Sequence, residues 1–288
     1  MDDDGIAQLK KLPFWQGEIS IWPLTGGITN RNYGVEQADG QRFAVRLGHD
    51  IPLHGVMRFN ELAAASAAGR AGISPAVVFT APGVLISKLL PGRTLRPEEI
   101  RLQHNRRRVV ALLKHCHAGT YLRGPLLAFW VFHINRSYAA DLAAADSRLA
   151  PQLPRLLALN EQLERRIGPV EMVFGHNDLL AGNIFDDGVR LWLLDWDYAG
   201  FNSPLFDLAN LSSNNGFSEA EDNELLREYY GVVTEATWRG FLGMKCASLL
   251  REALWSAASE IHSTVDFDYV GYTAEYLERL EKAVAALV

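Results

Sequence analysis

Two stretches decide the fold: His176-Asn177-Asp178-Leu179-Leu180-Ala181-Gly182-Asn183, and Leu194-Asp195-Trp196-Asp197, whose first aspartate stands twelve residues after Asn183. The first stretch has the spacing H-x-D-x-x-x-x-N, and the second places an acidic residue directly after an apolar strand. An aspartate after a strand is usually a cap or a turn residue, and H-x-D alone means little. Three such elements at matched spacing, on loops beside a predicted hairpin, are hard to obtain by chance and indicate one site.

This set of side chains suits phosphoryl transfer, and the spacing is that of a kinase catalytic loop. Because transfer builds negative charge on a phosphate that already carries much of it, Mg²⁺ must bridge the phosphates. Mg²⁺ prefers oxygen ligands such as carboxylates and amide carbonyls, which Asn183 and Asp195 supply. Asp178 is then the carboxylate that orients and deprotonates the attacking hydroxyl.

The composition is that of a globular protein larger than one core. The chain has 288 residues, 48% hydrophobic and 22% charged, with a net charge of −6, which excludes disorder, collagen-like repeats and coiled coils. The length exceeds the comfortable size of one hydrophobic core, so two lobes are expected. The net negative charge disfavours broad nucleic-acid binding. Two cysteines cannot form a disulfide framework.

No membrane or export segment is expected. The sequence has no stretch of about 18 uncharged apolar residues, so no transmembrane helix and no membrane insertion are predicted. The start, Met1-Asp2-Asp3-Asp4, is acidic and lacks the apolar core of a signal peptide. A cytoplasmic location is therefore the expectation.

The first third of the chain predicts antiparallel strands. The predicted strands span 19–24, 32–37, 41–47, 76–80 and 84–89. Asp39-Gly40 is a strong hairpin signal between the second and third of them. In the third strand Phe43, Val45 and Leu47 share one face, so Arg46 points away from the apolar side.

The rest of the chain predicts mainly helices. An Ala-rich helix at 57–68 completes the first lobe, and Leu90-Pro91-Gly92 is the predicted hinge. One helical run begins at Pro97 and ends near Gly119, and a hairpin spans 184–194. Further helices are predicted at 137–148, 154–167, 219–230, 235–261 and 267–286. The fold class is α+β, with a nucleotide-binding lobe at 1–90 and a catalytic and substrate-binding lobe at 91–288.

A glycine-containing loop precedes the cation of the first lobe. Leu24-Thr25-Gly26-Gly27-Ile28-Thr29-Asn30 lies between two strands, where glycines allow close approach to phosphate and free N–H groups can cradle it. The loop stands ahead of the inward-facing Arg46 and of Glu61 on the helix. This order is typical of a nucleotide-binding lobe in which the cation neutralises phosphate charge and the glutamate holds the cation.

These motifs resemble the choline/ethanolamine kinases, within the wider group of aminoglycoside-phosphotransferase-like small-molecule kinases. The matching blocks are 26–33, 44–47, 176–183, 194–200, 206–210, 254–256 and 266–272. Residues 98–170 match weakly. The resemblance implies a protein-kinase-like two-lobed fold, with an N-terminal antiparallel sheet carrying one helix and a mainly helical C-terminal lobe.

The resemblance also implies ATP and Mg²⁺ as cofactors and assigns residues to them. Asp178 is the implied catalytic base, and Asn183 and Asp195 are the implied Mg²⁺ ligands. Asn30 and Arg46 are expected at the ATP phosphates. The nucleotide-binding residues implied in full are Gly26, Gly27, Thr29, Asn30, Arg46, Glu61, Lys88 and Leu90, the last two from the hinge segment 87–90, whose backbone is expected at adenine.

The acceptor pocket is predicted in the C-terminal half. A quaternary ammonium cannot donate hydrogen bonds, so aromatic faces and nearby carboxylates must recognise it. The candidate acceptor-binding residues are Asp178, Asp197, Glu252, Trp255, Tyr269 and Tyr272. The resemblance puts Trp255 and Tyr272 in the family's aromatic box, and Glu252 stands where choline kinases often carry a second tryptophan. Glu252 lies one helical turn before Trp255, so it can supply charge in place of the missing ring, which suits a primary ammonium as well as choline.

Three groups outside these motifs are expected to be structural. Asp207 is expected to brace the catalytic loop by hydrogen bonding. Arg106-Arg107-Arg108 is expected to form a solvated helix face. Cys116 and Cys246 are expected to be packed apolar residues.

The predicted protein is an ATP-dependent kinase of a small cationic alcohol, with choline first and ethanolamine second. Kinases of aminoglycosides or thiamine are alternatives within the class, and a nucleotide-binding pseudokinase regulator is the alternative outside it. Asp178, Asn183 and Asp195 are all present, which disfavours the pseudokinase. The region after Asp197 leads quickly to Phe206 without an obvious activation segment, which disfavours a protein substrate. The oligomeric state stays open, with a homodimer as one option.

Overall fold

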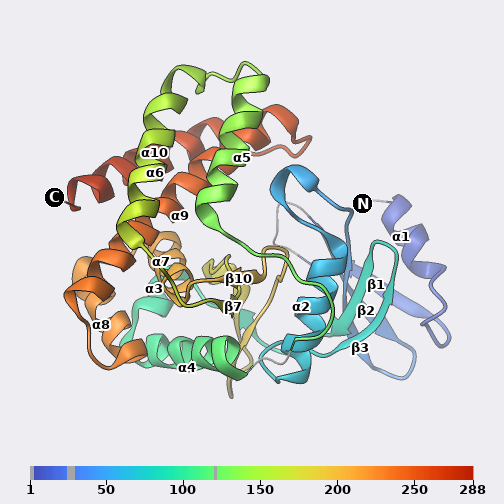
Figure 1. Cartoon of the computed structure of the whole chain (residues 1–288). Helices are drawn as coiled ribbons and strands as arrows, with labels where there is room; N and C mark the ends of the chain where they lie inside the picture. The colour runs from blue at the N-terminus through green and yellow to red at the C-terminus, as the bar shows by residue number, and fades with distance from the viewer. Residues whose placement is uncertain (1–2, 25–29, 120–121, 288) are drawn as a thin grey trace.

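The computed structural model describes residues 3–24, 30–119 and 122–287. It has the mixed α+β architecture expected from the sequence, with a five-stranded antiparallel sheet at the N-terminal end beside a mainly helical part (Figure 1). The strand order is β1-β2-β3-β5-β4. The strands are β1 (Ile19–Pro23), β2 (Arg31–Gln37), β3 (Arg42–Leu47), β4 (Val77–Ala81) and β5 (Val84–Lys88), all within one or two residues of the prediction.

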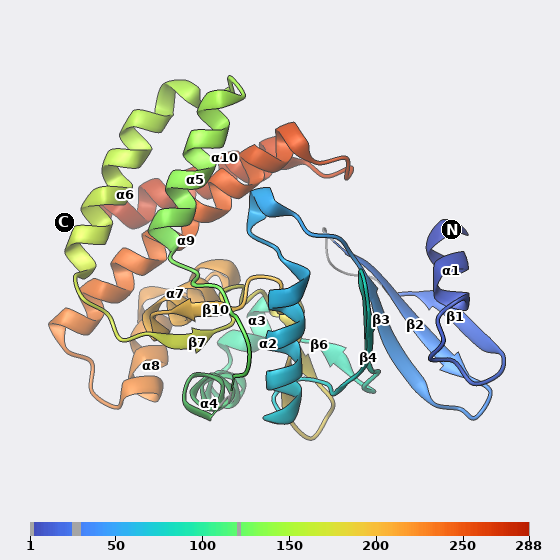
Figure 2. The same cartoon turned by 45° about the vertical axis from the view of Figure 1, so that its right-hand side comes forward.

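The alternation predicted for β3 decides what each face of the sheet contacts. Phe43, Val45 and Leu47 are buried in one apolar cluster, which Leu9 of α1 (Asp3–Lys10) joins. Arg46 emerges on the opposite face and contacts α2 (Arg58–Arg70). The sheet therefore lies between α1 and α2, as Figure 2 shows, and only its α2 side faces the helical part.

Two short sheets carry the loops of the predicted site. In the first, β7 (Val173–Gly175) pairs with β10 (Gly200–Asn202). In the second, β6 (Arg93–Thr94) pairs with β8 (Ile184–Asp186), which pairs with β9 (Leu191–Leu193), so the predicted hairpin is confirmed. Gly92 at the predicted hinge has φ +135°, and a Cβ there would lie 2.2 Å from the Asp186 carbonyl oxygen, so this position requires glycine.

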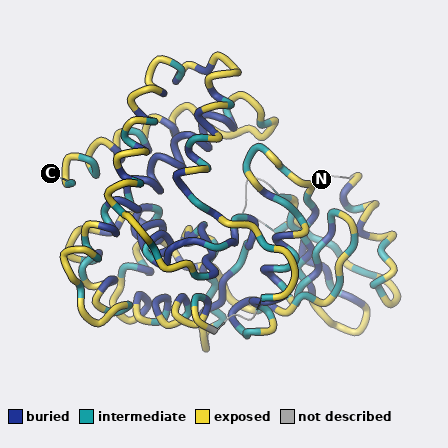
Figure 3. The backbone as a smooth tube through the Cα atoms, in the orientation of Figure 1, coloured by how far each residue is buried: buried dark blue, intermediate teal, exposed yellow. Residues whose placement is uncertain are grey.

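The helical part is built around one long central helix. Its helices are α3 (Pro97–Arg101), α4 (Gln103–Gly119), α5 (Val131–Ala144), α6 (Leu153–Ile167), α7 (Pro204–Asn215), α8 (Glu219–Tyr230), α9 (Glu235–His262) and α10 (Tyr269–Ala285). Helix α9 packs against α5, α6, α7 and α10. Figure 3 shows the buried backbone gathered where these helices meet. Both cysteines, Cys116 and Cys246, are buried, as expected.

Two helical expectations were wrong, and one helix was missed. The run from Pro97 is interrupted at Leu102, whose ψ of 130° ends α3 before α4 begins. The helix predicted at 137–148 begins six residues earlier, because Val131 and Phe132 are buried and extend its apolar face. Helix α7 was not predicted as a helix, although Ser203 caps it and Pro204 opens it.

The expectation that Arg106-Arg107-Arg108 forms a solvated helix face was wrong for Arg106. Arg106 is 1% exposed, and its guanidinium pairs with Glu224 and Glu228 of α8. Arg108 pairs with Asp186 in the hairpin, 2.9 Å away. These arginines join α4 to α8 and β8. Their partners stand about 80 or more residues away in sequence, so the contacts are long-range.

His54 ties the N-terminal part to the helices. Its Nδ1 lies 3.0 Å from the hydroxyl of Tyr138 on α5, and its Nε2 lies 3.3 Å from the Ser259 hydroxyl on α9. Burial, with the nearby charges of Arg251 and His262, lowers the pKa of His54 from 6.5 to about 4. The imidazole is therefore neutral in the folded protein at neutral pH.

We expect this histidine to make stability depend on pH. Because the unfolded chain binds a proton near pH 6.5 and the folded protein only near pH 4, stability is full above pH 6.5 and falls as the pH drops between these values. The wild type should lose about 2 kcal/mol more than His54→Gln between pH 7 and pH 5. Urea unfolding of both proteins at the two pH values measures this, and parallel losses would contradict it.

Within residues 3–24, 30–119 and 122–287, no helix combines the length and the apolar character that a membrane crossing requires.

Candidate active site

The loop after β7 carries Asp178, and two side chains of α7 accept hydrogen bonds from its backbone. The carboxylate of Asp207, 1% exposed, accepts hydrogen bonds from the backbone N–H groups of His176 at 2.9 Å and Asn177 at 2.7 Å. One turn later, Asn210 accepts the N–H of Leu179 at 2.6 Å. The bracing role expected for Asp207 matches these contacts, and they fix the backbone on both sides of Asp178.

His117 on α4 completes this brace. Its Nε2 lies 2.9 Å from the Asp207 carboxylate, and its Nδ1 lies 2.7 Å from the Tyr229 hydroxyl. Burial alone would raise the pKa of Asp207, but the hydrogen bond and charge of His117, together with His176, lower it. The carboxylate is therefore held in its charged form inside the protein.

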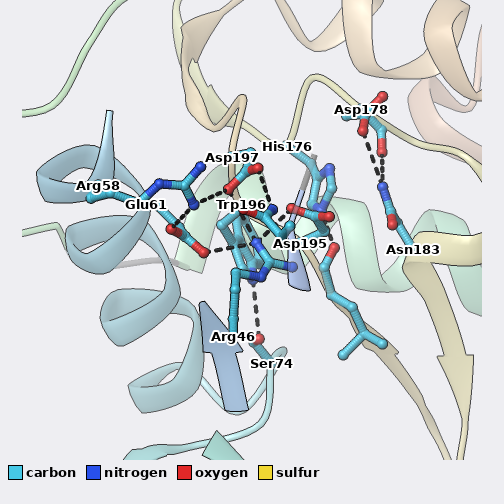
Figure 4. Close-up of polar contacts among 12 residues, drawn as sticks. Arg46, Arg58, Glu61, Ser74, His176, Asp178, Asn183, Asp195, Trp196 and Asp197 are labelled. Atoms are coloured by element: carbon cyan, nitrogen blue, oxygen red, sulfur yellow. Dashed lines mark hydrogen bonds and ion pairs between the residues drawn. The ribbon is translucent and has the colours of Figure 1, made fainter. Parts of the chain in front are cut away.

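Asp178 and Asn183 face each other across the loop. The Asn183 amide nitrogen donates to the Asp178 carbonyl oxygen at 2.8 Å and to its carboxylate at 3.2 Å, as Figure 4 shows. The amide oxygen of Asn183 is thereby turned away from Asp178 and is available to a cation. Burial raises the pKa of Asp178 to about 8, against the opposing charge of Arg251.

The segment after β9 presents two further carboxylates. Asp195 has φ +64°, a left-handed conformation that aspartate tolerates better than most residues and that turns its side chain toward β3. Trp196 is buried, and its indole N–H donates to the Ser74 hydroxyl at 3.0 Å. This anchor fixes the backbone between Asp195 and Asp197.

Arg46 lies at the centre of these carboxylates. Its Nη1 is 2.7 Å from Glu61, 2.8 Å from Asp195 and 3.1 Å from Asp197 (Figure 4). The pairing predicted between Arg46 and Glu61 is present. Burial opposes the charge of Arg46, but the three carboxylates raise its pKa further above its usual range.

Arg58 is a second cation at this place, and the sequence reasoning missed it. Its Nη1 lies 2.5 Å from Glu61 and 3.0 Å from Asp197, so two arginines and two carboxylates alternate in a closed ring. Asn30 donates to the other Asp197 oxygen at 2.8 Å. Asp197, expected at the acceptor, lines the cavity and is engaged with Arg46, Arg58 and Asn30. The sequence did carry a signal for the pairing of Arg58 with Glu61, because residues three positions apart on a helix lie side by side.

One cavity of about 440 Å³ joins these groups to the predicted acceptor residues. Apolar residues of the sheet and of α2, among them Ala44, Leu85 and Ala65, line one end. Asp178, Glu252, Trp255 and Tyr272 line the other end, and Arg46, Asn183, Asp195 and Asp197 lie along the walls. The distribution fits a ligand with a flat apolar group at one end and a charged centre.

Several predicted residues lie elsewhere. Lys88 and Leu90 are not among the residues that line the cavity. The N–H of Lys88 donates to the Ala76 carbonyl oxygen, and the Lys88 side chain is exposed. Ser87 does line the cavity. Tyr269 also lies outside the lining, with its hydroxyl 2.9 Å from the Ser263 hydroxyl and its ring edge-on to Trp255. Gly26, Gly27 and Thr29 fall outside the described residues.

The donor set fits a magnesium-nucleotide. Among the described residues, no three His, Cys, Asp or Glu side chains form a metal cluster. Mg²⁺ at phosphates typically takes one or two protein oxygens and leaves its other positions to phosphate and water. The Asp195 carboxylate and the Asn183 amide oxygen meet that requirement beside the cationic Arg46.

The comparisons with known proteins agree with this geometry. The sequence model of the choline/ethanolamine kinase family matches residues 21–224. "Protein LicA" of Haemophilus influenzae is 29% identical over 279 residues, covering 91% of this chain and 78% of that protein. "Ethanolamine kinase 2" of Homo sapiens is 28% identical over 297 residues, covering 90% and 75%.

The fold is also that of a solved relative. The crystal structure of choline kinase LicA from Streptococcus pneumoniae superposes with a TM-score of 0.83 at 21% identity, covering 99% of this chain and 100% of that chain. The expected α+β kinase fold is therefore confirmed over almost the full length.

Proposed function

Because the chain belongs to the choline/ethanolamine kinase family, whose members are phosphotransferases with alcohol acceptors, we propose that it transfers the γ-phosphoryl group of ATP to the hydroxyl of choline or ethanolamine. One observation carries the proposal. A single cavity contains Asp178 hydrogen-bonded to Asn183, the cationic Arg46 beside Asp195, and the rings of Trp255 and Tyr272. These are a base, a phosphate-binding centre and an ammonium-binding end in one space.

Asp178 is the group that orients the acceptor. Its carboxylate lies between Asn183 and Arg251, so it can accept the hydrogen bond of a substrate hydroxyl and take its proton as the oxygen attacks phosphorus. Burial strengthens this interaction because little water competes for the carboxylate. The brace from Asp207 keeps the base from moving during the step.

The nucleotide is held on the sheet side. Arg46 offers positive charge to the phosphates, and Glu61 and Arg58 fix its guanidinium. Asn183 and Asp195 would hold Mg²⁺, which supplies charge neutralisation at the phosphates when bound. We propose the division between a nucleotide-binding part at 1–90 and a catalytic part at 91–288 on the same basis.

The acceptor panel tests this proposal. The purified protein is incubated with ATP and Mg²⁺ and with choline, ethanolamine, thiamine or an aminoglycoside, and phosphorylated product is measured directly. We expect product with choline or ethanolamine and none with the other two acceptors. Product only with thiamine or the aminoglycoside would overturn the acceptor assignment, and no product with any acceptor would overturn the transfer activity.

A further inference from the structure

Arg251 and Glu252 place a buried ion pair in the wall of the acceptor end of the cavity. Arg251 is 2% exposed and Glu252 4% exposed, and Arg251 Nη1 donates to Glu252 Oε1 over 2.6 Å. The other carboxylate oxygen, Oε2, accepts a hydrogen bond from the Tyr272 hydroxyl at 3.1 Å. The Glu252 carboxylate is therefore fixed from two sides, and all three residues line the cavity.

This ion pair stands in a buried, otherwise apolar stretch of α9. Its neighbours on α9, Leu250 and Ala253, are fully buried and apolar. A buried ion pair often returns less free energy than its desolvation costs, so packing alone does not explain it. Within the part of the chain that the structure describes, Arg251 Nε and Nη2 are buried without a hydrogen-bond partner, and the guanidinium lies over the Tyr198 ring, 4.2 Å from its centroid.

The Glu252 carboxylate would interact differently with an ammonium that carries N–H groups and with a quaternary one. Trp255 and Tyr272 offer two rings, with centroids 6.0 Å apart and an interplanar angle of 67°, and the carboxylate stands beside them. Methyl groups packed against that carboxylate would remove its water without returning a hydrogen bond. An ammonium that carries N–H groups can donate to a remaining lone pair of Glu252 while it lies against the rings.

We propose that Arg251, Glu252 and Tyr272 form a hydrogen-bonding wall that selects amino alcohols whose ammonium carries N–H groups over quaternary ones. The inference rests on the proposed function, because it places the acceptor hydroxyl at Asp178 and the ammonium at this wall. Arg251 is a positioning residue here. It fixes Glu252 and reduces the repulsion between that carboxylate and Asp178, whose Oδ1 lies 4.0 Å from Arg251 Nη1.

A methylation series tests the wall in the wild-type protein. kcat/KM is measured at saturating ATP and Mg²⁺ for ethanolamine, N-methylethanolamine, N,N-dimethylethanolamine and choline. We expect small changes over the first two methylations and a fall of about 10- to 100-fold at the third, where the last N–H is lost. An even decline along the series would indicate selection by size, and a flat series would indicate no selection. Either of these results overturns the proposal of a hydrogen-bonding wall.

Two variants assign the selection to these residues. Glu252→Leu should bring the ethanolamine-to-choline ratio of kcat/KM close to one, mainly by slowing ethanolamine. Arg251→Lys keeps the positive charge and should retain the preference. The matched control is Glu260→Gln on the same helix, which breaks an ion pair with Arg148 outside the cavity lining and should leave the ratio unchanged.

The outcomes separate the two proposals. An unchanged preference in folded Glu252→Leu overturns the wall while leaving the proposed function intact. Should Glu252→Leu not fold, the wild-type series still decides. Failure of all four alcohols to give product would overturn the proposed function, and the wall with it.

Discussion

Asp178→Asn should lower kcat by a factor of about 10³ while leaving ATP affinity nearly unchanged. The amide keeps the size of the side chain and can still bond to Asn183, but it cannot accept the proton of the acceptor hydroxyl. Arg46 and Asp195, the proposed nucleotide-binding groups, pair with each other and do not depend on Asp178. Single-turnover product formation measures the chemical step, and nucleotide titration of the same protein measures binding.

The same substitution should raise stability. Burial raises the pKa of Asp178 to about 8, and the nearby carboxylates of Glu252 and Asp195 add to the rise, so the charged form opposes folding. Asn removes that charge, and we expect the free energy of unfolding at pH 8 to rise by about 1 kcal/mol or more. An inactive variant that is at least as stable as the wild type excludes misfolding as the cause of the lost activity.

The control for Asp178→Asn is Asp187→Asn. Asp187 lies in the turn between β8 and β9, where it is half-buried and accepts hydrogen bonds from the turn backbone and from Trp192. It is a carboxylate of the same hairpin region outside the cavity, and its substitution should leave kcat within about twofold. Turnover by Asp178→Asn within tenfold of the wild type would show that the assigned base is wrong.

The site motifs could be predicted because their geometry is local. Asp178 and Asn183 are five residues apart, so the loop between two short strands alone brings them together. The alternation of apolar and polar side chains along β3 likewise predicted that Arg46 lies opposite the apolar face. Such contacts follow from backbone periodicity and turn chemistry, which a single sequence carries.

The residues that were missed act through distant partners. Arg58 contacts Asp197 across 139 residues, and Arg106 contacts Glu228 across 122, so no local pattern could pair them. Arg251 left a weaker signal, since it stands with Glu252 in the otherwise apolar run from Leu249 to Leu254. Charges in a helix segment that is apolar on every side indicate burial, and buried charges require partners or ligands.

The segment 87–90 shows what a resemblance leaves open. The resemblance implies that the backbone of this segment lies at adenine, and it does not say which side chains face the cavity. Strand β5 continues through Lys88, so the N–H of Lys88 is used in sheet pairing and its side chain turns outward, while Ser87 faces the cavity. The predicted strand 84–89 already contained Lys88, and the alternation of side chains along a strand places Ser87 and Lys88 on opposite faces.

Asp207→Asn should lower both stability and turnover. The carboxylate accepts three hydrogen bonds, from His117 and from the backbone of His176 and Asn177, and an amide can replace only one of its two accepting oxygens. At least one buried donor then faces an NH₂ group. We expect the free energy of unfolding to fall by about 3 kcal/mol. kcat should fall by about 10- to 100-fold because Asp178 follows directly after the two backbone groups that are released.

Asp222→Asn is the matched control, because it separates the loss of a buried carboxylate from the loss of the brace. Asp222 is also 1% exposed and is paired with Lys245 at 2.5 Å, but it lies on α8 and does not contact the loop. Both variants should be less stable in urea, and only Asp207→Asn should lower kcat when the assays are run at a temperature where both remain folded. Should Asp207→Asn not fold, His117→Phe removes one donor and should show a smaller loss of the same kind. Equal kcat for Asp207→Asn, Asp222→Asn and the wild type would mean that α7 stabilises the fold without positioning the base.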